Sequence, residues 1–228
     1  MVELTESTQS DLANLVNSSV AKNGELIVAE FQSAGRGRLD RTFQAPPQSA
    51  LLFSFYIEPK RVINDWSFIS FLASMAMHEV ISKDLEEVAT LKWPNDILIG
   101  DKKVAGLLAQ QTDRGVIVGI GINVEMSEGE LPVPTATSLA MCRSNNLNRN
   151  QLLSEFLNRF ESTFQEWDSG TDFLEQYRQI SSTIGSQVRV DVVGRDSIEG
   201  EAVAISASGA LILADGYEVN VGDVVHLR

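Results

Sequence analysis

Three arginines on a short glycine-containing segment are the residues of this sequence best suited to binding an anion. Arg36, Arg38 and Arg41 lie within the run Gly35–Arg41, which reads GRGRLDR. A guanidinium keeps its charge at physiological pH and binds phosphate or carboxylate through parallel N–H donors, and glycine lets backbone N–H groups approach an anion. The segment predicts a loop for a nucleotide or an acyl phosphate. A solvated basic turn is the alternative, and the run is neither a Walker A loop nor a dinucleotide-binding fingerprint.

The run Lys92–Asp96, which reads KWPND, is a second candidate. Proline fixes the local backbone. Lys92 could contact phosphate groups, and Asp96 could orient a metal-bound phosphate or a ribose hydroxyl. In the alternative interpretation Trp93 belongs to the core and Asp96 is a turn residue at the entry of an edge strand.

Glycines inside two expected strands indicate that another group approaches the backbone closely. Gly106 follows Lys103 in the run KVAGLLAQQ, and Gly119 and Gly121 precede Asn123 in GVIVGIGINV. An interior glycine weakens a strand unless a ligand or another backbone uses the space. Lys103 could polarise a carboxylate under attack, and Asn123 could contact an adenine edge or a phosphate. The alternatives are a charged hairpin turn at Lys103 and a twisted core strand that ends at Asn123.

An α/β arrangement of elements must position these residues. Apolar periodicity predicts a helix over 8–20 with Thr8 as its N-cap, and a second helix capped by Asp65. Two or three helices are expected between about 148 and 181, with an inner face formed by Leu152, Leu153, Phe156, Leu157, Phe160 and Phe164.

Apolar runs predict strands over 25–31, 50–57 and 115–124. The run LKWPNDILI is expected to enter a strand, and KVAGLLAQQ to return as its antiparallel partner. From about residue 182 the sequence changes to short alternating segments separated by glycine and aspartate. That change predicts a small all-β unit.

Composition excludes several classes of protein. A length of 228 residues with 43% hydrophobic residues suits a globular chain, and a net charge of −13 argues against broad neutralisation of nucleic-acid phosphates. Cys142 is the only cysteine, so no intrachain disulfide and no four-cysteine zinc site are expected. The sequence shows no signal peptide and no apolar span of ~20 residues. We therefore expect a cytoplasmic protein.

Taken in order, the motifs resemble those of the biotin protein ligases. Glu6-Ser7-Thr8 is similar to the family's biotin-pocket element, and residues 29–38 resemble its strand and biotinyl-adenylate loop. The later blocks that match are KWPND, Lys103-x-x-Gly106, Gly119-x-Gly121-x-Asn123 and the run ATSL at 136–139. The resemblance covers nearly the whole chain.

This resemblance implies an α/β (α+β) fold and a two-step reaction. Residues 1–181 would form a mixed-sheet catalytic domain related to class II aminoacyl-tRNA synthetases and lipoate ligases, and residues 182–228 an SH3-like β-barrel. Biotin and MgATP would give biotinyl-5′-AMP and pyrophosphate. A lysine ε-amine on the biotin carboxyl carrier domain of a biotin-dependent carboxylase would then take the biotin. Mg²⁺ is expected with ATP, and no metal ligand is assigned.

The resemblance also implies residue roles. The residues expected to bind biotin are Ser7, Thr8, Gln9, Gln32, Arg36, Gly37, Arg38, Lys103 and Gly106. Those expected to bind ATP are Gly35, Arg36, Arg38, Arg41, Phe43, Asn95, Asn123 and Arg228. Catalytic roles are expected for Lys103, Arg36, Arg38, Lys92 and Asp96, with Lys103 contacting both the biotin carboxylate and the α-phosphate.

The chain departs from the family pattern at three places. Gln9 stands where asparagine is frequent, and Leu39-Asp40 replaces a basic residue followed by glycine. Phe43 stands where tryptophan is common, which still permits stacking. Because the Ser7-Thr8 motif lies near the start of the sequence, no DNA-binding domain is expected.

Two other functions remain open at this point, as does the choice between monomer and homodimer. A lipoate or octanoate ligase would share the fold but would need a long apolar tunnel. A non-catalytic biotin-binding module would not need Lys103 and the loop arginines.

Overall fold

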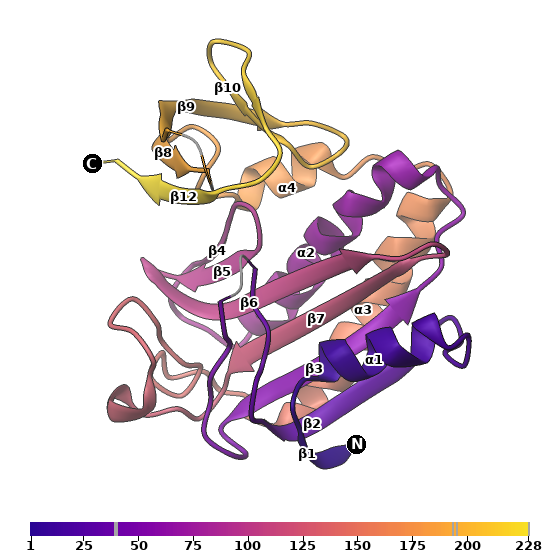
Figure 1. Ribbon diagram of the computed structural model, residues 1–228. Coiled ribbons are helices and arrows are strands. Elements are labelled where there is room, and N and C mark those ends of the chain that lie inside the picture. Colours follow the sequence, from indigo (N-terminus) through magenta and orange to yellow (C-terminus); the bar gives the residue numbers. More distant parts are fainter. Residues whose placement is uncertain (39–40, 193, 195, 228) are drawn as a thin grey trace.

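A seven-stranded sheet forms the centre of the computed structural model, which describes residues 1–38, 41–192, 194 and 196–227 (Figure 1). Its strand order is β1-β2-β3-β7-β6-β5-β4. β1 runs parallel to β2, and every other neighbouring pair is antiparallel. The strands are β1 (Val2–Thr5), β2 (Leu26–Gln32), β3 (Ala50–Ile57), β4 (Ala89–Lys92), β5 (Asp96–Ile99), β6 (Lys102–Gln111) and β7 (Val116–Asn123).

Helices cover the two faces of this sheet unequally. α2 (Ile69–Ser82) and α3 (Arg149–Asp168) lie behind the sheet in Figure 1, and α1 (Thr8–Asn17) lies in front of it. Side chains alternate between the faces of a strand. Phe53 and Phe55 of β3 therefore join the large core with α2 and α3, whereas Tyr56 packs against α1.

Aromatic rings fill the core behind the sheet. The ring centroids of Phe53 and Phe156 are 5.2 Å apart, and those of Phe55 and Phe160 are 4.7 Å apart. Tilted and edge-to-face pairs at these separations contribute about 0.5–1.5 kcal/mol each beyond burial. All six residues expected on the inner face of the 148–181 helices are buried in this core or packed against it.

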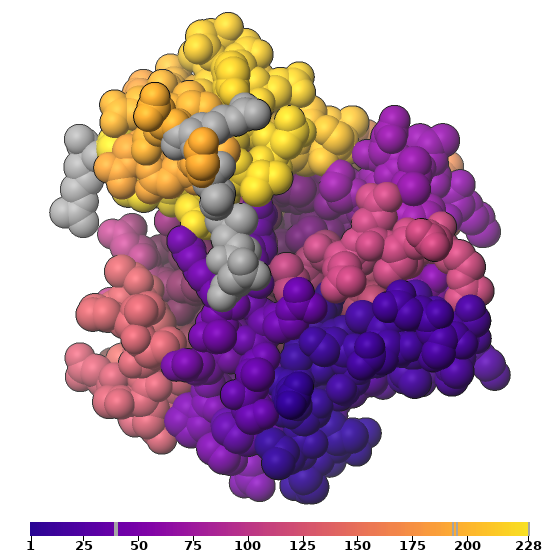
Figure 2. Space-filling model, in the orientation of Figure 1, coloured from indigo at the N-terminus to yellow at the C-terminus, as the bar shows by residue number. Residues whose placement is uncertain are grey.

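The C-terminal segment forms a five-stranded antiparallel sheet of order β11-β10-β9-β8-β12. It follows α4 (Leu174–Ile180) and lies above the seven-stranded sheet in Figure 1, and Figure 2 shows it as an upper lobe. Trp93 joins the two parts, since its Nε1 donates to the Gly209 carbonyl at 2.9 Å. The strands are β8 (Gln187–Asp191), β9 (Ile198–Ile205), β10 (Leu211–Leu213), β11 (Glu218–Val219) and β12 (Asp223–His226).

Most elements expected from the sequence are confirmed. The strand over 50–57 is β3, the antiparallel pairing of β5 with β6 is present, and the all-β tail is a sheet. The division at 181/182 stays a prediction. No helix within the part of the chain that the structure describes is long and apolar enough to cross a membrane.

Four local expectations are wrong or incomplete. Ser7, not Thr8, is the N-cap of α1. The 3₁₀ helix η1 (Ile63–Phe68) precedes α2, so Asp65 does not cap that helix. The run LKWPNDILI divides into β4 and β5 because Pro94 has no N–H for a strand ladder. β1 is an additional edge strand, too short and too exposed to leave an apolar pattern.

Two glycines with the same backbone conformation give a test of how the C-terminal sheet is attached. Gly209 and Gly216 have φ of +83° and +85°. A methyl group at Gly209 would overlap the Phe71 ring, whereas at Gly216 it meets nothing within 4 Å. We expect Gly216→Ala to lose roughly 1–2 kcal/mol of unfolding free energy from left-handed strain, and Gly209→Ala to lose about 1–3 kcal/mol more from overpacking. Urea unfolding measures both, and equal losses would contradict the packing described.

Candidate functional site

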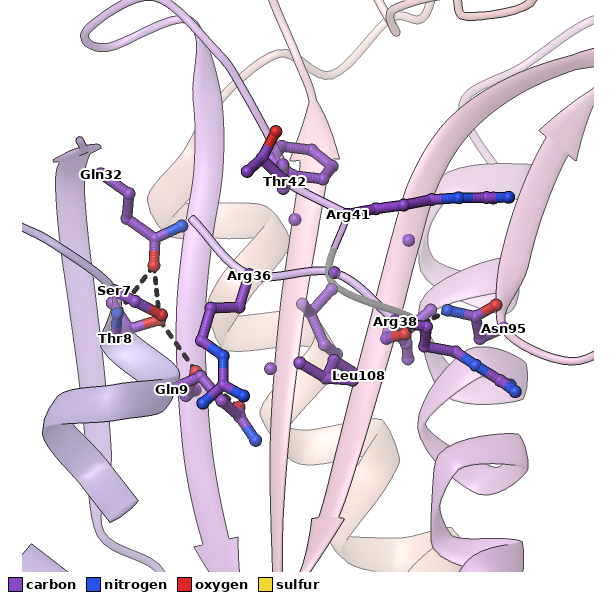
Figure 3. Close-up of a pocket in the computed structure, with 18 of the residues that line it drawn as sticks. Ser7, Thr8, Gln9, Gln32, Arg36, Arg38, Arg41, Thr42, Asn95 and Leu108 are labelled. Atoms are coloured by element: carbon purple, nitrogen blue, oxygen red, sulfur yellow. Dashed lines mark hydrogen bonds between the residues drawn. The ribbon is translucent and has the colours of Figure 1, made fainter. Parts of the chain in front are cut away.

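A cavity of about 130 Å³ lies on the sheet face that carries α1, beneath the arginine loop (Figure 3). Arg36, Gly37 and Arg38 of this loop also line a second cavity of about 490 Å³, whose wall includes Gly209 and Val221 of the C-terminal segment. The first cavity brings together most residues singled out in the sequence. Those that line it are Ser7, Thr8, Gln9, Gln32, Arg36, Gly37, Arg38, Arg41, Phe43, Asn95, Asp96, Lys103 and Gly106.

Glycines form the floor of this cavity. Gly121 of β7 is paired with Gly106 of β6, and Gly119 is paired with Ser54 of β3. An added Cβ at Gly119 would lie 2.6 Å from Gln9 Oε1, and one at Gly121 would lie 2.7 Å from the Phe43 ring. The glycines are therefore required because other side chains rest directly on the sheet backbone.

Hydroxyl and amide groups form one end of the cavity. The backbone N–H of Thr8, in the first turn of α1, donates to Gln32 Oε1 at 2.7 Å, and the Thr8 hydroxyl donates to the same oxygen at 3.0 Å (Figure 3). The Ser54 hydroxyl lies 2.8 Å from the Thr8 hydroxyl and donates to Gln9 Oε1 at 3.2 Å. This end is neutral, so it suits a polar uncharged group.

Cations form the other end. Lys103 Nζ lies 2.6 Å from Asp96 Oδ1, and both side chains line the cavity. Partial burial lowers the pKa of Arg38, and the nearby carboxylates of Asp223 and Asp96 oppose that shift. A guanidinium keeps its charge at neutral pH, and Arg38 and Lys103 together can bind a carboxylate or a phosphate.

Backbone hydrogen bonds and one ion pair hold the arginine loop over the cavity. Gly37 N–H donates to the Arg41 carbonyl at 2.7 Å, and Phe43 N–H donates to the Gly35 carbonyl at 2.9 Å. The Arg41 guanidinium pairs with the Asp223 carboxylate at the start of β12. Asp223 also lines the cavity, so the C-terminal sheet supplies part of the site.

Four expected residues lie elsewhere or outside the described residues. Gly35 lines a neighbouring cavity of about 360 Å³. Lys92 is paired in register with Asp96 but does not line the cavity. Asn123 is buried and donates to the Thr137 carbonyl at 2.9 Å, so its side chain holds the following loop. Arg228 lies outside the described residues, as do Leu39 and Asp40.

Sequence reasoning missed Ser54 and Asp223 as residues of the site. Ser54 is the serine of an otherwise apolar and aromatic strand, and that single hydroxyl was the available signal. Asp223 lies near the other end of the chain, where no local pattern connects it to the loop. Neither histidine lines the cavity, and burial lowers the pKa of both His78 and His226.

The donor set suits a magnesium ion that arrives with phosphates. Among the described residues, no group of three or more His, Cys, Asp and Glu side chains could hold a metal by itself. Asp96 and Asp223 are carboxylates in the cavity wall. Mg²⁺ is commonly held by one or two carboxylates together with substrate phosphates and water, so Asp96 fits as a protein ligand.

Comparison with known proteins assigns this architecture to a class. Residues 1–127 match the biotin/lipoate A/B protein ligase family, and residues 183–227 match the biotin protein ligase C-terminal domain. The chain belongs to this ligase family, and within it to the biotin protein ligases.

Individual relatives agree with this assignment. The chain is 34% identical to the biotin--[acetyl-CoA-carboxylase] ligase of Mycobacterium tuberculosis over 100% of its own length and 88% of that protein. It is 28% identical to the bifunctional ligase/repressor BirA of Bacillus subtilis over 92% of its length and 67% of that protein. The structure of Aquifex aeolicus biotin protein ligase in complex with biotin and ATP matches with a TM-score of 0.83 and 27% identity, covering 100% of this chain and 97% of that one.

The glycine floor predicts that a single methyl group can move Lys103. An added Cβ at Gly106 would lie 2.9 Å from both Cε and Nζ of Lys103, which is the flexible end of that side chain. We expect Gly106→Ala to change the unfolding free energy by less than about 1 kcal/mol and to lower ligase activity by roughly 100-fold through misplacement of Lys103. Gly129→Ala, where a Cβ meets nothing within 4 Å, is the control. Full activity of Gly106→Ala would show that the position of Lys103 is not critical.

Proposed function

We propose that this chain activates biotin with ATP to biotinyl-5′-AMP and transfers the biotinyl group to a lysine of a biotin carboxyl carrier domain. The observation that carries the proposal is the single cavity that joins a neutral hydroxyl–amide end to Lys103 and Arg38. Biotin has the same asymmetry, with a polar uncharged ureido ring and a carboxylate at the end of its chain. The Mycobacterium tuberculosis and Aquifex aeolicus relatives are biotin ligases, and the structure of the latter is a complex with biotin and ATP.

In the first step, a carboxylate oxygen of biotin attacks the α-phosphorus of ATP. The new O–P bond forms as the bond from that phosphorus to the bridging oxygen of the β-phosphate breaks, and pyrophosphate leaves. Two anions must approach each other, so cations have to offset their repulsion. Lys103 is the residue we propose to contact both the carboxylate and the α-phosphate. Mg²⁺ bound to the nucleotide, with Asp96 as a protein ligand, would neutralise further phosphate charge.

In the second step, the neutral ε-amine of the acceptor lysine attacks the biotinyl carbonyl carbon. An amide bond forms, the bond from that carbon to the AMP oxygen breaks, and the amine releases one proton. Arg36, Gly37 and Arg38 are proposed to cover the mixed anhydride and to exclude water until the amine arrives. Lys92 and Asn95 are proposed to help place the phosphates and the amine, and Asn123 and Arg228 to lie toward the nucleotide.

The proposed acceptor is a carboxylase carrier domain, as the name of the Mycobacterium tuberculosis relative indicates for that protein. ATP supply places the proposed reaction in the cytoplasm. Lipoate is the less suitable acid, because its ring has no N–H donors for the carbonyl and hydroxyl oxygens at the neutral end of the cavity.

Pyrophosphate exchange into ATP tests the first step and the role of Lys103 together. We expect the unmodified protein to exchange with biotin, and neither with lipoate nor without an acid. Lys103→Ala should lose the exchange by about 10²-fold or more, because a cation at the transferred phosphoryl group is removed. Lys102→Ala, which removes an exposed lysine at the adjacent position, should keep it. Exchange with lipoate would overturn the choice of substrate, and retention of exchange by Lys103→Ala would overturn its role.

Release of the adenylate tests the role of the arginine loop. Arg38 is half-buried and lines both cavities. We expect Arg38→Ala to form the adenylate but to lose it to water and to lysines of unrelated proteins. Biotinylation of a carrier domain mixed with serum albumin, read by avidin blotting, measures that loss. Arg178→Ala, an exposed arginine of α4, is the control. Unchanged selectivity for the carrier domain would refute the proposed shielding.

A further inference from the structure

Ser54 is a fully buried hydroxyl that no sequence motif singles out. It lies in the middle of β3, and its exposed fraction is 0%. Its side chain faces the cavity, on the same side of the sheet as Gly119, with which it is paired. A Cβ at Gly119 would lie 3.1 Å from Ser54 Oγ, so the hydroxyl occupies space that the glycine leaves free.

Three short contacts around Ser54 share only two hydroxyl protons. The Thr8 hydroxyl lies 3.0 Å from Gln32 Oε1 and 2.8 Å from the Ser54 hydroxyl. The Ser54 hydroxyl in turn lies 3.2 Å from Gln9 Oε1. The carbonyl oxygens of both glutamines can only accept. Each hydroxyl has a single proton, so one of the three contacts always lacks a hydroxyl proton.

If each hydroxyl donates to its own glutamine, the 2.8 Å contact between the two hydroxyls has no proton. Two other orders place a proton in that contact. In the first, Thr8 donates to Ser54 and Ser54 donates to Gln9, while Gln32 Oε1 keeps the backbone N–H of Thr8 at 2.7 Å. In the second, Ser54 donates to Thr8 and Thr8 donates to Gln32. The second order leaves Gln9 Oε1 without a donor. The Gln9 side chain itself stays in place, because its Nε2 donates to the Ile117 carbonyl at 3.4 Å.

We propose that Ser54 is a positioning residue that switches the hydrogen-bond direction at the neutral end of the cavity, so that Gln9 Oε1 accepts an N–H from the substrate ring. This inference rests on the proposed function, which supplies a substrate with two ureido N–H groups. When one ureido N–H donates to Gln9 Oε1, the Ser54 hydroxyl donates to the Thr8 hydroxyl instead. Every acceptor in this row of hydrogen bonds then has a donor. Such coupled hydroxyls strengthen one another in a water-poor site.

The first test compares Michaelis constants in pyrophosphate exchange. In the free protein Ser54→Ala leaves Gln9 Oε1 without the Ser54 donor, whereas in the complex the substrate N–H supplies one. The variant therefore loses more in the free state, and KM for biotin should fall about 5- to 10-fold, the size expected when a buried polar group gains a partner on binding. KM for ATP and kcat should stay within about twofold, because the cationic end is untouched. Ser54→Cys, which keeps the size with a weak donor, should fall between. An unchanged KM for biotin would reduce Ser54 to a packing residue.

A second measurement separates switching from simple loss of packing. The ligand is a biotin analogue in which one ureido N–H is replaced by an ether oxygen, giving a cyclic carbamate of nearly the same size. Both positional isomers are titrated by calorimetry against the unmodified protein and Ser54→Ala. The isomer that lacks the N–H facing Gln9 should lose little affinity in the unmodified protein, because Ser54 can donate to Gln9 Oε1 instead. Ser54→Ala has no such donor, so its preference for biotin over that isomer should be larger by about 10-fold or more. The same preference in both proteins would overturn the proposal.

Matched controls separate this inference from the proposed function. Ser74→Ala removes a buried α2 hydroxyl that donates to the Ser70 carbonyl at 2.8 Å, away from the cavity, and should change neither KM. Thermal unfolding of each variant shows whether the fold persists. Absence of biotin-dependent exchange in the unmodified protein would defeat the proposed function. Normal exchange there with an unshifted Ser54→Ala would defeat only the role of Ser54.

Discussion

The absence of side chains at three strand positions is the constraint on which the site depends. Gly106, Gly119 and Gly121 leave a bare patch of sheet backbone, and Lys103, Gln9 and Phe43 rest on it. These side chains come from a strand, a helix and a loop, so no single element could bring them together. Interior glycines weaken a sheet, and the opposite face compensates by packing aromatic rings against α2 and α3. One face stabilises the sheet, and the other is left free for chemistry.

Local residue types made much of this arrangement predictable. The glycines that interrupt apolar strands indicated close approach, and the arginine run indicated a loop for anions, and the structure places both at one cavity. Register was not predictable, because the pairing of Gly119 with Ser54 depends on strands that are distant in the sequence. Ser54 was therefore hidden in an apolar run. Asn123 shows the same limit, since the sequence did not indicate that its amide N–H donates to the Thr137 carbonyl.

Contacts between the two sheets set a second limit on prediction. Asp223 pairs with Arg41 from the far end of the chain, and Trp93 reaches the Gly209 carbonyl. The motif that contains Trp93 suggested a core tryptophan and, as the other interpretation, a ligand-binding run, and the two are compatible in the structure. Trp93 is buried against the C-terminal sheet, while Asn95 and Asp96 of the same run line the cavity. Attachment of the C-terminal sheet thus also fixes the backbone that presents Asp96.

Charge pairing explains why an acidic chain can keep a cationic site, and why that site needs several cations. The net charge is −13, and Lys103 and Arg41 each lie against a carboxylate, Asp96 and Asp223. An incoming anion that simply joined Lys103 and Asp96 would place two negative groups around one ammonium. The Arg38 guanidinium, within the influence of both carboxylates, offsets that excess without a change of protonation. We therefore expect a substrate with two anionic groups to bind more favourably than a single carboxylate, because it can engage Lys103 and the loop arginines at once.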